Sequence, residues 1–232
     1  GLGTSSPSIV GNWNGLAFDE PYRHSRDVLR VVRAALAGER VDGVFDTFTI
    51  KRFKLEQPPA VPPAVLLAAL LPQMLRLAGR EADGAILNWL ASGDVARCVE
   101  AIGNPGADVV ARVFVCPSPD PEYARRLGRL LISTYLTVPA YARFHDWLGR
   151  GEALRPMHEA WARGDRAGAA AAIPDEVVDA LVLHGTPESC RAQVRDYAAA
   201  GVRTPVIALL PTPEATDAGA LLDVVRRLGP EA

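Results

Sequence analysis

The amino-acid sequence predicts a parallel α/β fold, and two kinds of pattern support this prediction. Apolar runs without polar alternation, typical of strands covered on both faces, occur at residues 65–70, 85–88 and 206–210, and a further strand is predicted at residues 109–116. Segments with helical periodicity separate these runs. Because strands and helices alternate along the chain, the strands are expected to lie parallel in one sheet, with the helices packed against it.

The first residues of the chain are rich in glycine and hydroxyl side chains. Residues 1–8 are predicted to be the end of a strand running into a loop that allows close approach of a ligand. The GxG at residues 1–3 lacks the third glycine of the dinucleotide-binding fingerprint, so it is a weak indication of such a site. A helix is predicted over residues 21–37, and its His24 is expected to be a surface residue rather than a catalyst.

In the next segment, residues 41–57, the spacing of the apolar residues changes from a helical period to alternation. The alternation predicts a small β insertion outside the main repeat. Four prolines between residues 56 and 63 then predict an extended link to the central part of the chain.

Residues 61–90 predict a complete strand–helix–strand crossover. Pro72 suits the first turn of the helix, and Gly79 inside the helix is expected to cost about 1 kcal/mol relative to alanine. The N–H groups from Leu70 to Met74 would point outward at the helix N-terminus, where an anion can bind. The same pattern also fits an ordinary strand–helix connection, which every α/β protein contains several times.

The second half of the chain continues the alternation. A helix is predicted over residues 93–102, and residues 120–180 are predicted to form a helical insertion, since they are too long for one crossover. Thr186 is a good helix cap, and the last predicted helices cover residues 187–200 and 218–228. With the strand end near Gly1, the pattern gives five strands. An eight-stranded barrel would need three more, and these would lie upstream of Gly1.

Composition excludes several classes of protein. The 232 residues carry a formal net charge of -2, which gives no basic footprint for nucleic acid or an anionic membrane. No apolar run is long enough to span a membrane, and no signal peptide is visible, so a cytoplasmic location is expected. The three cysteines and four histidines are dispersed, which indicates neither a disulfide framework nor a metal site.

Three blocks of this sequence, in order, resemble the luciferase-like flavin and deazaflavin oxidoreductases. The blocks are GLGTSS at residues 1–6, the stretch from residue 61 to residue 88, and HGTPESCRAQVRDYAAAGV at residues 184–202. The resemblance covers nearly the whole chain, so residues 1–232 are expected to form one luciferase-like oxidoreductase domain. It implies a TIM barrel of the luciferase-like type, here without its first three βα units and with the helical insertion before the last strand. Within the family, the sequence is most similar to the branch that uses the deazaflavin coenzyme F-420.

The resemblance also implies the residues that contact the cofactor. Backbone N–H groups of Ala68, Ala69, Leu70 and Leu71 would bind its phosphate. Other contacts would come from Gly3 and Thr4, along the ring or ribityl chain, and from Asn88, at the end of the following strand. Many members of the family have glycine where this chain has Leu70 or Leu71, and leucine narrows the approach. Ser6 stands where some members that oxidise sugar phosphates have an acid, which disfavours that chemistry.

The expected activity is hydride transfer between coenzyme F-420 and an unknown small organic substrate. The catalytic acid or base is not assigned, because the strands expected to carry it would lie upstream of Gly1. FMN is the alternative cofactor, in a luciferase-like monooxygenase. A third alternative is a truncated, non-catalytic chain that acts as a binding or interaction module. A homodimer is expected from the family resemblance.

Overall fold

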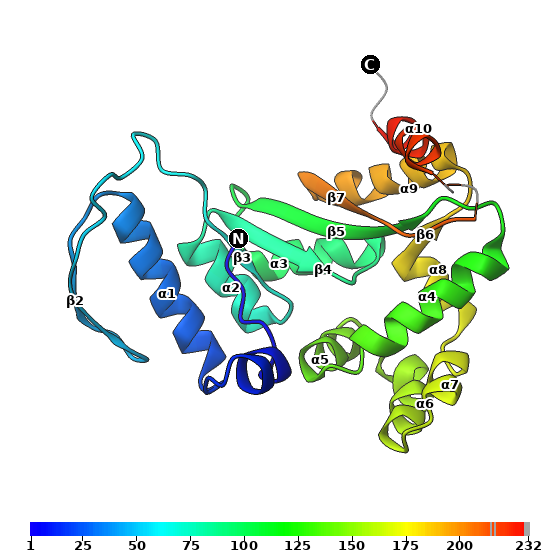
Figure 1. Cartoon of the computed structure of the whole chain (residues 1–232), viewed down its shortest axis with the longest axis horizontal. Coiled ribbons are helices and arrows are strands. Elements are labelled where there is room, and N and C mark those ends of the chain that lie inside the picture. The colour runs from blue at the N-terminus through cyan, green and yellow to red at the C-terminus, as the bar shows by residue number, and fades with distance from the viewer. Residues whose placement is uncertain (214, 216, 230–232) are drawn as a thin grey trace. The chain divides into compact units, whose positions relative to one another are not determined.

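The structure, a computed structural model, describes residues 1–213, 215 and 217–229. The last three positions of the predicted 1–232 domain lie outside the described residues. The chain divides into two compact units, the first made of Gly1–Ile86 and Glu100–Asp108, the second of Leu87–Val99 and the chain from Val109 onward. Each unit is described by itself, and Figure 1 labels their helices and strands.

The first unit contains a long helix and an antiparallel hairpin that lies along it (Figure 1). After the short helix η1 (Ser8–Trp13), helix α1 spans Pro21–Leu36, and the hairpin consists of β1 (Val41–Val44) and β2 (Thr49–Phe53). The small β insertion predicted at residues 41–57 is therefore present. The prediction that residues 1–8 run into an irregular loop was incomplete, because η1 begins at Ser8.

The predicted crossover forms the rest of the first unit. Strand β3 (Leu66–Ala68), helix α2 (Pro72–Glu81) and strand β4 (Gly84–Asn88) follow one another, and β3 and β4 pair in parallel with Leu66 opposite Gly84. Leu2 adds a single parallel bridge to Leu67 on the other side of β3. The strand predicted at residues 65–70 is shorter than expected, because only three residues keep ladder geometry before the chain turns toward α2.

Two glycines allow close packing in this crossover. A Cβ on Gly79 would overlap the carbonyl oxygen of Ile102, and one on Gly84 would overlap that of Asp108. The side chain of Asn104 donates a hydrogen bond of 2.9 Å to the Gly79 carbonyl oxygen. Gly79 is thus required by the backbone that packs against α2, which accounts for a glycine in the middle of a helix.

The second unit is built on β5 (Asp108–Cys116), which pairs in parallel with β6 (Val182–His184) and with β7 (Thr204–Leu209). Its helical elements are η2 (Ser92–Asp94), α3 (Val95–Ile102), α4 (Pro121–Tyr135), α5 (Pro139–Trp147), α6 (Gly151–Ala162), α7 (Arg166–Ala171), α8 (Asp175–Leu181), α9 (Pro187–Ala199) and α10 (Ala218–Leu228). The hydrophobic core of this unit brings Trp89 and Phe114 together with residues of α4, α6, α7 and α8.

One expectation about the strands needs correction. Strand β6 was missed, and it stands between the helical insertion and β7, so the insertion does not directly precede the last strand. The strand pairings of the described residues do not close into a barrel, and the expected barrel without its first three βα units stays a prediction. The parallel α/β class itself is confirmed, since every pairing among β3 to β7 within each unit is parallel.

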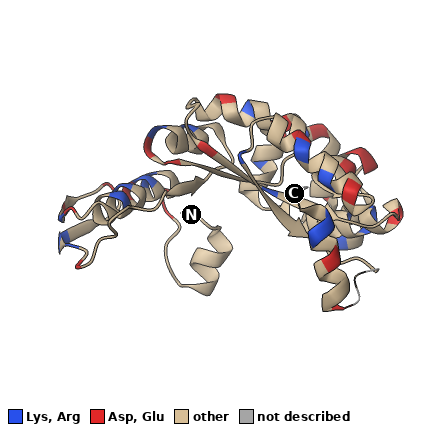
Figure 2. Cartoon of the chain, turned by 90° about the horizontal axis from the view of Figure 1, so that it is seen from above, with Lys and Arg blue, Asp and Glu red and all other residues tan. Residues whose placement is uncertain are grey.

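The surface mixes charges of both signs, with Lys and Arg next to Asp and Glu on many of the helices (Figure 2). Among the described residues, no helix combines the length and the apolar character that a membrane span would need.

Candidate functional site

Gly3 lies directly against strand β3 in the first unit. The N–H of Leu2 donates to the carbonyl oxygen of Leu66 over 2.8 Å, and the N–H of Ala68 donates to the carbonyl oxygen of Leu2 over 2.7 Å. A Cβ on Gly3 would lie 3.3 Å from the Cβ of Ala68. The structure therefore brings together Gly3 and Ala68, two of the residues predicted to contact a cofactor, although 65 positions separate them in sequence.

The backbone donors predicted for a phosphate fall into two groups. The N–H of Ala68 is bound to Leu2, and that of Ala69 donates to the carbonyl oxygen of Ile86 over 3.1 Å. These two amides are therefore not free to bind an anion, and their predicted role as phosphate donors is corrected. Leu70 and Leu71 differ, because within the described part of the chain the structure records no partner for their N–H groups.

The first turn of α2 adds further N–H groups to those of Leu70 and Leu71. Leu71 is the N-cap residue, with extended backbone (φ -95°, ψ 155°) and no side-chain cap, and Pro72 begins the helix. The amides of Gln73 and Met74 belong to the first turn, which has no intrahelical acceptors. The end of the helix thus offers several N–H groups and the positive end of its dipole, the arrangement that suits a phosphate.

A groove of about 670 Å³ is lined by Gly3 and Thr4. The rest of its lining comes from the loop around η1, the start of α1 and the β1–β2 turn, including Ser5, Leu16, Phe18, Asp19, Glu20, His24, Asp46 and Thr47. Its size suits a small organic molecule. The predicted site residues Gly3 and Thr4 therefore share a cavity with His24, whose side chain is exposed, as the sequence analysis expected.

A buried carboxylate supports one wall of this groove. Asp27 is 1% exposed and accepts hydrogen bonds from the Thr47 N–H (3.0 Å), the Thr47 hydroxyl (3.1 Å) and the Arg26 guanidinium (2.7 Å). Burial acts to raise the pKa of Asp27, but the hydrogen bonds from Arg26 and Thr47 hold that pKa below its ordinary value. Asp27 is thus a charged anchor that fixes the turn between β1 and β2 against α1.

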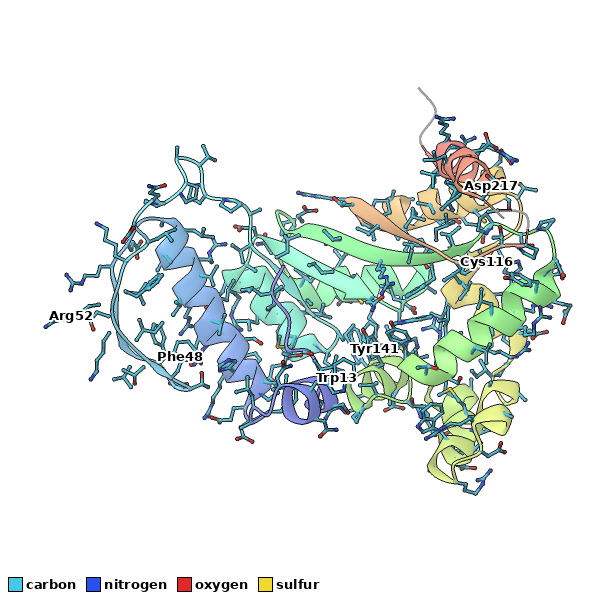
Figure 3. All side chains as sticks on the ribbon, in the orientation of Figure 1. Trp13, Phe48, Arg52, Cys116, Tyr141 and Asp217 are labelled. Carbon is cyan, nitrogen blue, oxygen red and sulfur yellow. The ribbon has the colours of Figure 1, made fainter. Side chains whose placement is uncertain are left out.

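Asn88 belongs to the second unit, where it ends β4 (Figure 3 labels its partner Tyr141). Its side-chain Nδ2 donates to the hydroxyl of Tyr141, on α5, over 2.8 Å. Its Oδ1 is buried and has no hydrogen-bond partner among the described residues. A buried carbonyl oxygen without a donor is unfavourable by about 1–3 kcal/mol, so this atom is suited to accept a hydrogen bond from a ligand.

Trp89, the next residue, is completely buried and has a left-handed backbone (φ 55°), which is unusual for a bulky residue. Its ring stacks on Phe114 with a centroid distance of 3.8 Å, and the guanidinium of Arg112 lies 4.6 Å from the centre of the Phe114 ring. Strained backbone of this kind persists where the surroundings impose it, often at functional sites. The strain at Trp89 fixes the direction in which β4 ends.

The loop after Trp89 is anchored by three contacts within the second unit. The hydroxyl of Tyr197 donates to the Leu90 carbonyl oxygen (2.8 Å), and Asp94 accepts from the Ala91 N–H (2.7 Å). Arg150 forms an ion pair of 2.9 Å with Asp94. These contacts come from α9 and from the start of α6, so the end of β4 is held by helices that are far away in sequence.

Sequence reasoning missed Tyr141 and the hydrogen bonds that link His24, Thr47 and Asp27. Tyr141 lies in a helical insertion without a motif, and its partner Asn88 is 53 positions earlier. His24, Asp27 and Thr47 come from two different elements. The available signal was weak in both cases, since it consisted only of a polar aromatic residue on an otherwise apolar helix face and of a histidine three positions before an aspartate.

The chain matches the luciferase-like monooxygenase family over residues 1–204. It belongs to this family. Among curated relatives, the 5,10-methylenetetrahydromethanopterin reductase of Archaeoglobus fulgidus is 25% identical over 84% of this chain and 62% of its own length. A putative coenzyme F-420-dependent oxidoreductase of Mycobacterium tuberculosis is 24% identical over 96% of this chain and 73% of its own length.

A solved structure shares the fold. The coenzyme F-420-dependent tetrahydromethanopterin reductase of Methanopyrus kandleri superposes with a TM-score of 0.72 at 19% identity, over 96% of this chain and 70% of that chain. The chain therefore shares the fold of this reductase. The chain spans 62% of the length of the A. fulgidus reductase, so it corresponds to part of that relative.

Within the described residues, no group of three or more His, Cys, Asp or Glu side chains is arranged to hold a metal ion.

Proposed function

We propose that this chain is part of an oxidoreductase that transfers a hydride between the deazaflavin coenzyme F-420 and a small organic substrate. The observation that carries the proposal is the uncapped N-terminus of α2, with the unpaired amides of Leu70 and Leu71, in the same crossover as the Gly3–Ala68 contact. Membership of the luciferase-like family supports it, as do the two similar proteins whose names include coenzyme F-420. Because the chain spans 62% of the A. fulgidus reductase, the activity of the whole protein belongs to the proposal.

The residues of the first unit fit the group that the proposal requires. The amides of Leu70, Leu71, Gln73 and Met74 would bind a phosphate at the positive end of α2. Gly3, which has no side chain, would leave room for a flat ring beside β3, and Thr4 would line the same groove. When bound, the deazaflavin supplies the carbon, C5, that accepts or donates the hydride.

The second unit, taken by itself, offers a polar contact to a ligand. Asn88 has a buried carbonyl oxygen without a partner among the described residues, so it would accept a hydrogen bond from an N–H or O–H group of a ligand. Tyr141 would keep the amide in the orientation that leaves this oxygen open. In this role both residues orient a ligand and exclude water, and neither moves a proton.

Binding measurements test the proposal directly. The full chain is titrated with coenzyme F-420 and, separately, with FMN, and binding is followed by the fluorescence of each cofactor. Micromolar or tighter binding of F-420, with weaker binding of FMN, supports the proposal. Binding of FMN without F-420 overturns the deazaflavin assignment, and binding of neither favours the alternative of a non-catalytic interaction module.

An FMN-dependent monooxygenase is the second candidate, and the family that the chain matches is itself named for this activity. In that case the chain and reduced FMN would consume oxygen at a rate above that of free reduced FMN. An oxygen electrode distinguishes the two candidates, because a deazaflavin reaction would proceed without oxygen uptake.

A further inference from the structure

Residues 5–19, which include η1, are held mainly by hydrogen bonds among themselves. The N–H of Val10 donates to the Ser6 carbonyl oxygen over 2.9 Å, and the N–H of Leu16 donates to the Val10 carbonyl oxygen over 3.0 Å. In the described part of the chain, every hydrogen bond recorded for this segment joins two residues of positions 4–19. None of its side chains is buried. The segment is therefore loosely attached to the rest of the first unit and can move as a body.

Two residues with left-handed backbone bound this segment. Ser5 (φ 58°) is its first residue, and Glu20 (φ 46°) follows its last residue, at the N-cap of α1. Neither residue is glycine, and the left-handed conformation is strained for other residues unless their surroundings impose it. Rotation of the backbone at these two positions would release the strain. Strained positions at both ends of a loosely attached segment are suited to act as hinges.

The segment also exposes large apolar side chains. Trp13 is 78% exposed and Leu16 is 65% exposed, and the side chain of Ile9 is exposed as well. Ile9 and Trp13 are four positions apart in η1, so they lie on the same face of this helix. Apolar side chains that gather on a surface often mark a place that another surface covers. The segment thus has an apolar face that is open to solvent in this conformation.

The groove that Gly3 and Thr4 line lies directly beside this face. Leu16 and Phe18 of the segment are part of its lining, and the hairpin turn contributes Asp46. Figure 3 shows Trp13 on η1, well apart from the hairpin turn, where Phe48 is labelled. Rotation at the two ends of the segment would carry η1 across the groove toward this turn. The apolar face of η1 would then be covered by the groove and its contents.

We propose that residues 5–19 form a flap, hinged at Ser5 and Glu20, that closes over this groove and brings Trp13 against the molecule bound there. Closing removes the apolar face of η1 from water and lets both hinge residues leave the left-handed region. A bound molecule adds a surface that only the closed flap contacts, so it shifts the flap toward the closed state. The use of coenzyme F-420 as the probe rests on the function proposed above, whereas the motion of the flap does not.

A disulfide bond can trap the closed flap without a ligand. The full chain with Trp13→Cys and Asp46→Cys is treated with oxidised glutathione, and the crosslink is detected by peptide mass spectrometry. A disulfide needs Cα atoms about 4.4–6.8 Å apart, so we expect the crosslink to form only when the flap crosses the groove. Flaps move within microseconds to milliseconds, much faster than thiol oxidation, so a sparsely populated closed state is also trapped.

The control for crosslinking combines Trp13→Cys with Arg40→Cys. Arg40 is an exposed residue beyond the far end of α1, and it does not line the groove. The flap cannot reach this position by closing, so the control pair should crosslink much more slowly. The three native cysteines are buried, and they should remain reduced in both variants.

Fluorine NMR reports the environment of Trp13 when a ligand binds. The full chain is labelled with 5-fluorotryptophan, and Trp13→Phe identifies the Trp13 resonance among the four tryptophans. Replacing H2O by D2O shifts the resonance of an exposed tryptophan. Trp13 should therefore show a solvent shift in the free chain and lose most of it when coenzyme F-420 is bound. Trp89, which is completely buried, is the internal control and should show no shift in either state.

Affinity measures how strongly closing of the flap is coupled to binding. Trp13→Ala should raise the Kd for coenzyme F-420 about 10-fold, mainly through faster dissociation. Leu222→Ala, which removes an exposed apolar side chain on α10, is the matched control and should keep the wild-type Kd. Ser5→Gly should raise the Kd about 3-fold to 5-fold, because glycine tolerates positive φ and removes the strain that closing releases. Ser5→Ala keeps this strain and should bind like the wild type.

The outcomes separate the flap from the proposed function. Failure of coenzyme F-420 to bind the wild type rejects the proposed function, and the crosslink then decides alone whether the flap closes. Crosslinking of the Trp13→Cys and Asp46→Cys variant no faster than that of the control overturns the flap, whether or not F-420 binds. Binding of F-420 with an unchanged solvent shift of Trp13, or with a wild-type Kd for Trp13→Ala, also overturns it.

Discussion

The side chain of Asn88 donates a hydrogen bond of 2.8 Å to the hydroxyl of Tyr141, and in doing so it leaves its own carbonyl oxygen buried without a partner among the described residues. The two residues come from the end of a strand and from a helix of the insertion. Burial raises the pKa of Tyr141, although the hydrogen bond from Asn88 opposes this effect, so the hydroxyl stays protonated at neutral pH. The pair is therefore a neutral, oriented contact.

We expect Tyr141→Phe to weaken cofactor binding by releasing the Asn88 amide. Loss of one hydrogen bond should lower the free energy of unfolding by about 1 kcal/mol and raise the Kd for coenzyme F-420 about 5-fold to 10-fold. Fluorescence titration and urea denaturation measure the two effects. Tyr135→Phe is the matched control, since the Tyr135 hydroxyl makes no hydrogen bond with the described residues. Equal Kd values for the Tyr141 variant and wild type would show that Asn88 does not contact the cofactor.

The amide of Leu71 can be removed without changing the rest of the loop. Its φ of -95° is close to the range of proline, so Leu71→Pro should keep the start of α2 and delete one N–H group. We expect the Kd for coenzyme F-420 to rise about 5-fold to 10-fold. The phosphate-free chromophore 8-hydroxy-5-deazariboflavin should bind equally well to both proteins.

Leu71→Gly is the control for this substitution, because it keeps the N–H group and removes the side chain. Its Kd for coenzyme F-420 should equal that of the wild type or fall below it. An equal loss of affinity for the phosphate-free chromophore in Leu71→Pro would show that the substitution disturbs the loop rather than the phosphate contact.

The substitution Gly79→Ala tests whether close packing or helix propensity determines the stability at this position. Propensity alone predicts that Gly79→Ala would stabilise α2 by about 1 kcal/mol. The structure predicts the opposite sign, because the added Cβ overlaps the Ile102 carbonyl oxygen, and such overpacking destabilises by about 1–3 kcal/mol. Urea denaturation measures the difference. Arg76→Ala, at an exposed position of the same helix, should change stability by less than about 0.5 kcal/mol.

The elements that sequence reasoning predicted well are those with local signals. Proline at the first helical position marks α1, α2 and α9, and each of these helices begins at the predicted residue. Strand β6 has no such signal. Residues 175–184 carry no turn signal between helix α8 and the strand, and only pairing with β5 makes the last three of them a strand.

The candidate site shows the same division. The sequence predicts that a ligand or another backbone segment can approach position 3 closely, because glycine has no side chain. The sequence does not predict that the amides of Ala68 and Ala69 are already hydrogen-bonded, because their acceptors, Leu2 and Ile86, lie on neighbouring chain segments. The contact between His24 and Thr47 likewise depends on a hydrogen bond between α1 and the hairpin turn. Local sequence predicts where a backbone group lies, while its hydrogen-bond partner depends on the tertiary fold.

His145 gives the protein a pH dependence of stability that can be worked out in sign. This side chain is fully buried on α5, and neither ring nitrogen makes a hydrogen bond of normal geometry with a described residue. Burial, and next the positive charge of Arg150, lower the pKa of His145 to about 3, while the backbone of Trp89 acts weakly in the opposite direction. In the unfolded chain the histidine has its ordinary pKa of about 6.5.

Between pH 6.5 and pH 3 the unfolded chain therefore binds a proton that the folded protein does not. The free energy of unfolding should have its full value above pH 6.5 and should fall by about 2–4 kcal/mol as the pH is lowered toward 3. Urea denaturation at pH 7.5, 7, 6.5, 6 and 5.5 measures the slope above the range in which most carboxylates titrate. His145→Leu should flatten this slope, whereas His158→Gln, at a less buried histidine, should change it less, because burial lowers the pKa of His158 by a smaller amount. A slope in His145→Leu equal to that of the wild type would show that His145 is not the group that titrates on unfolding.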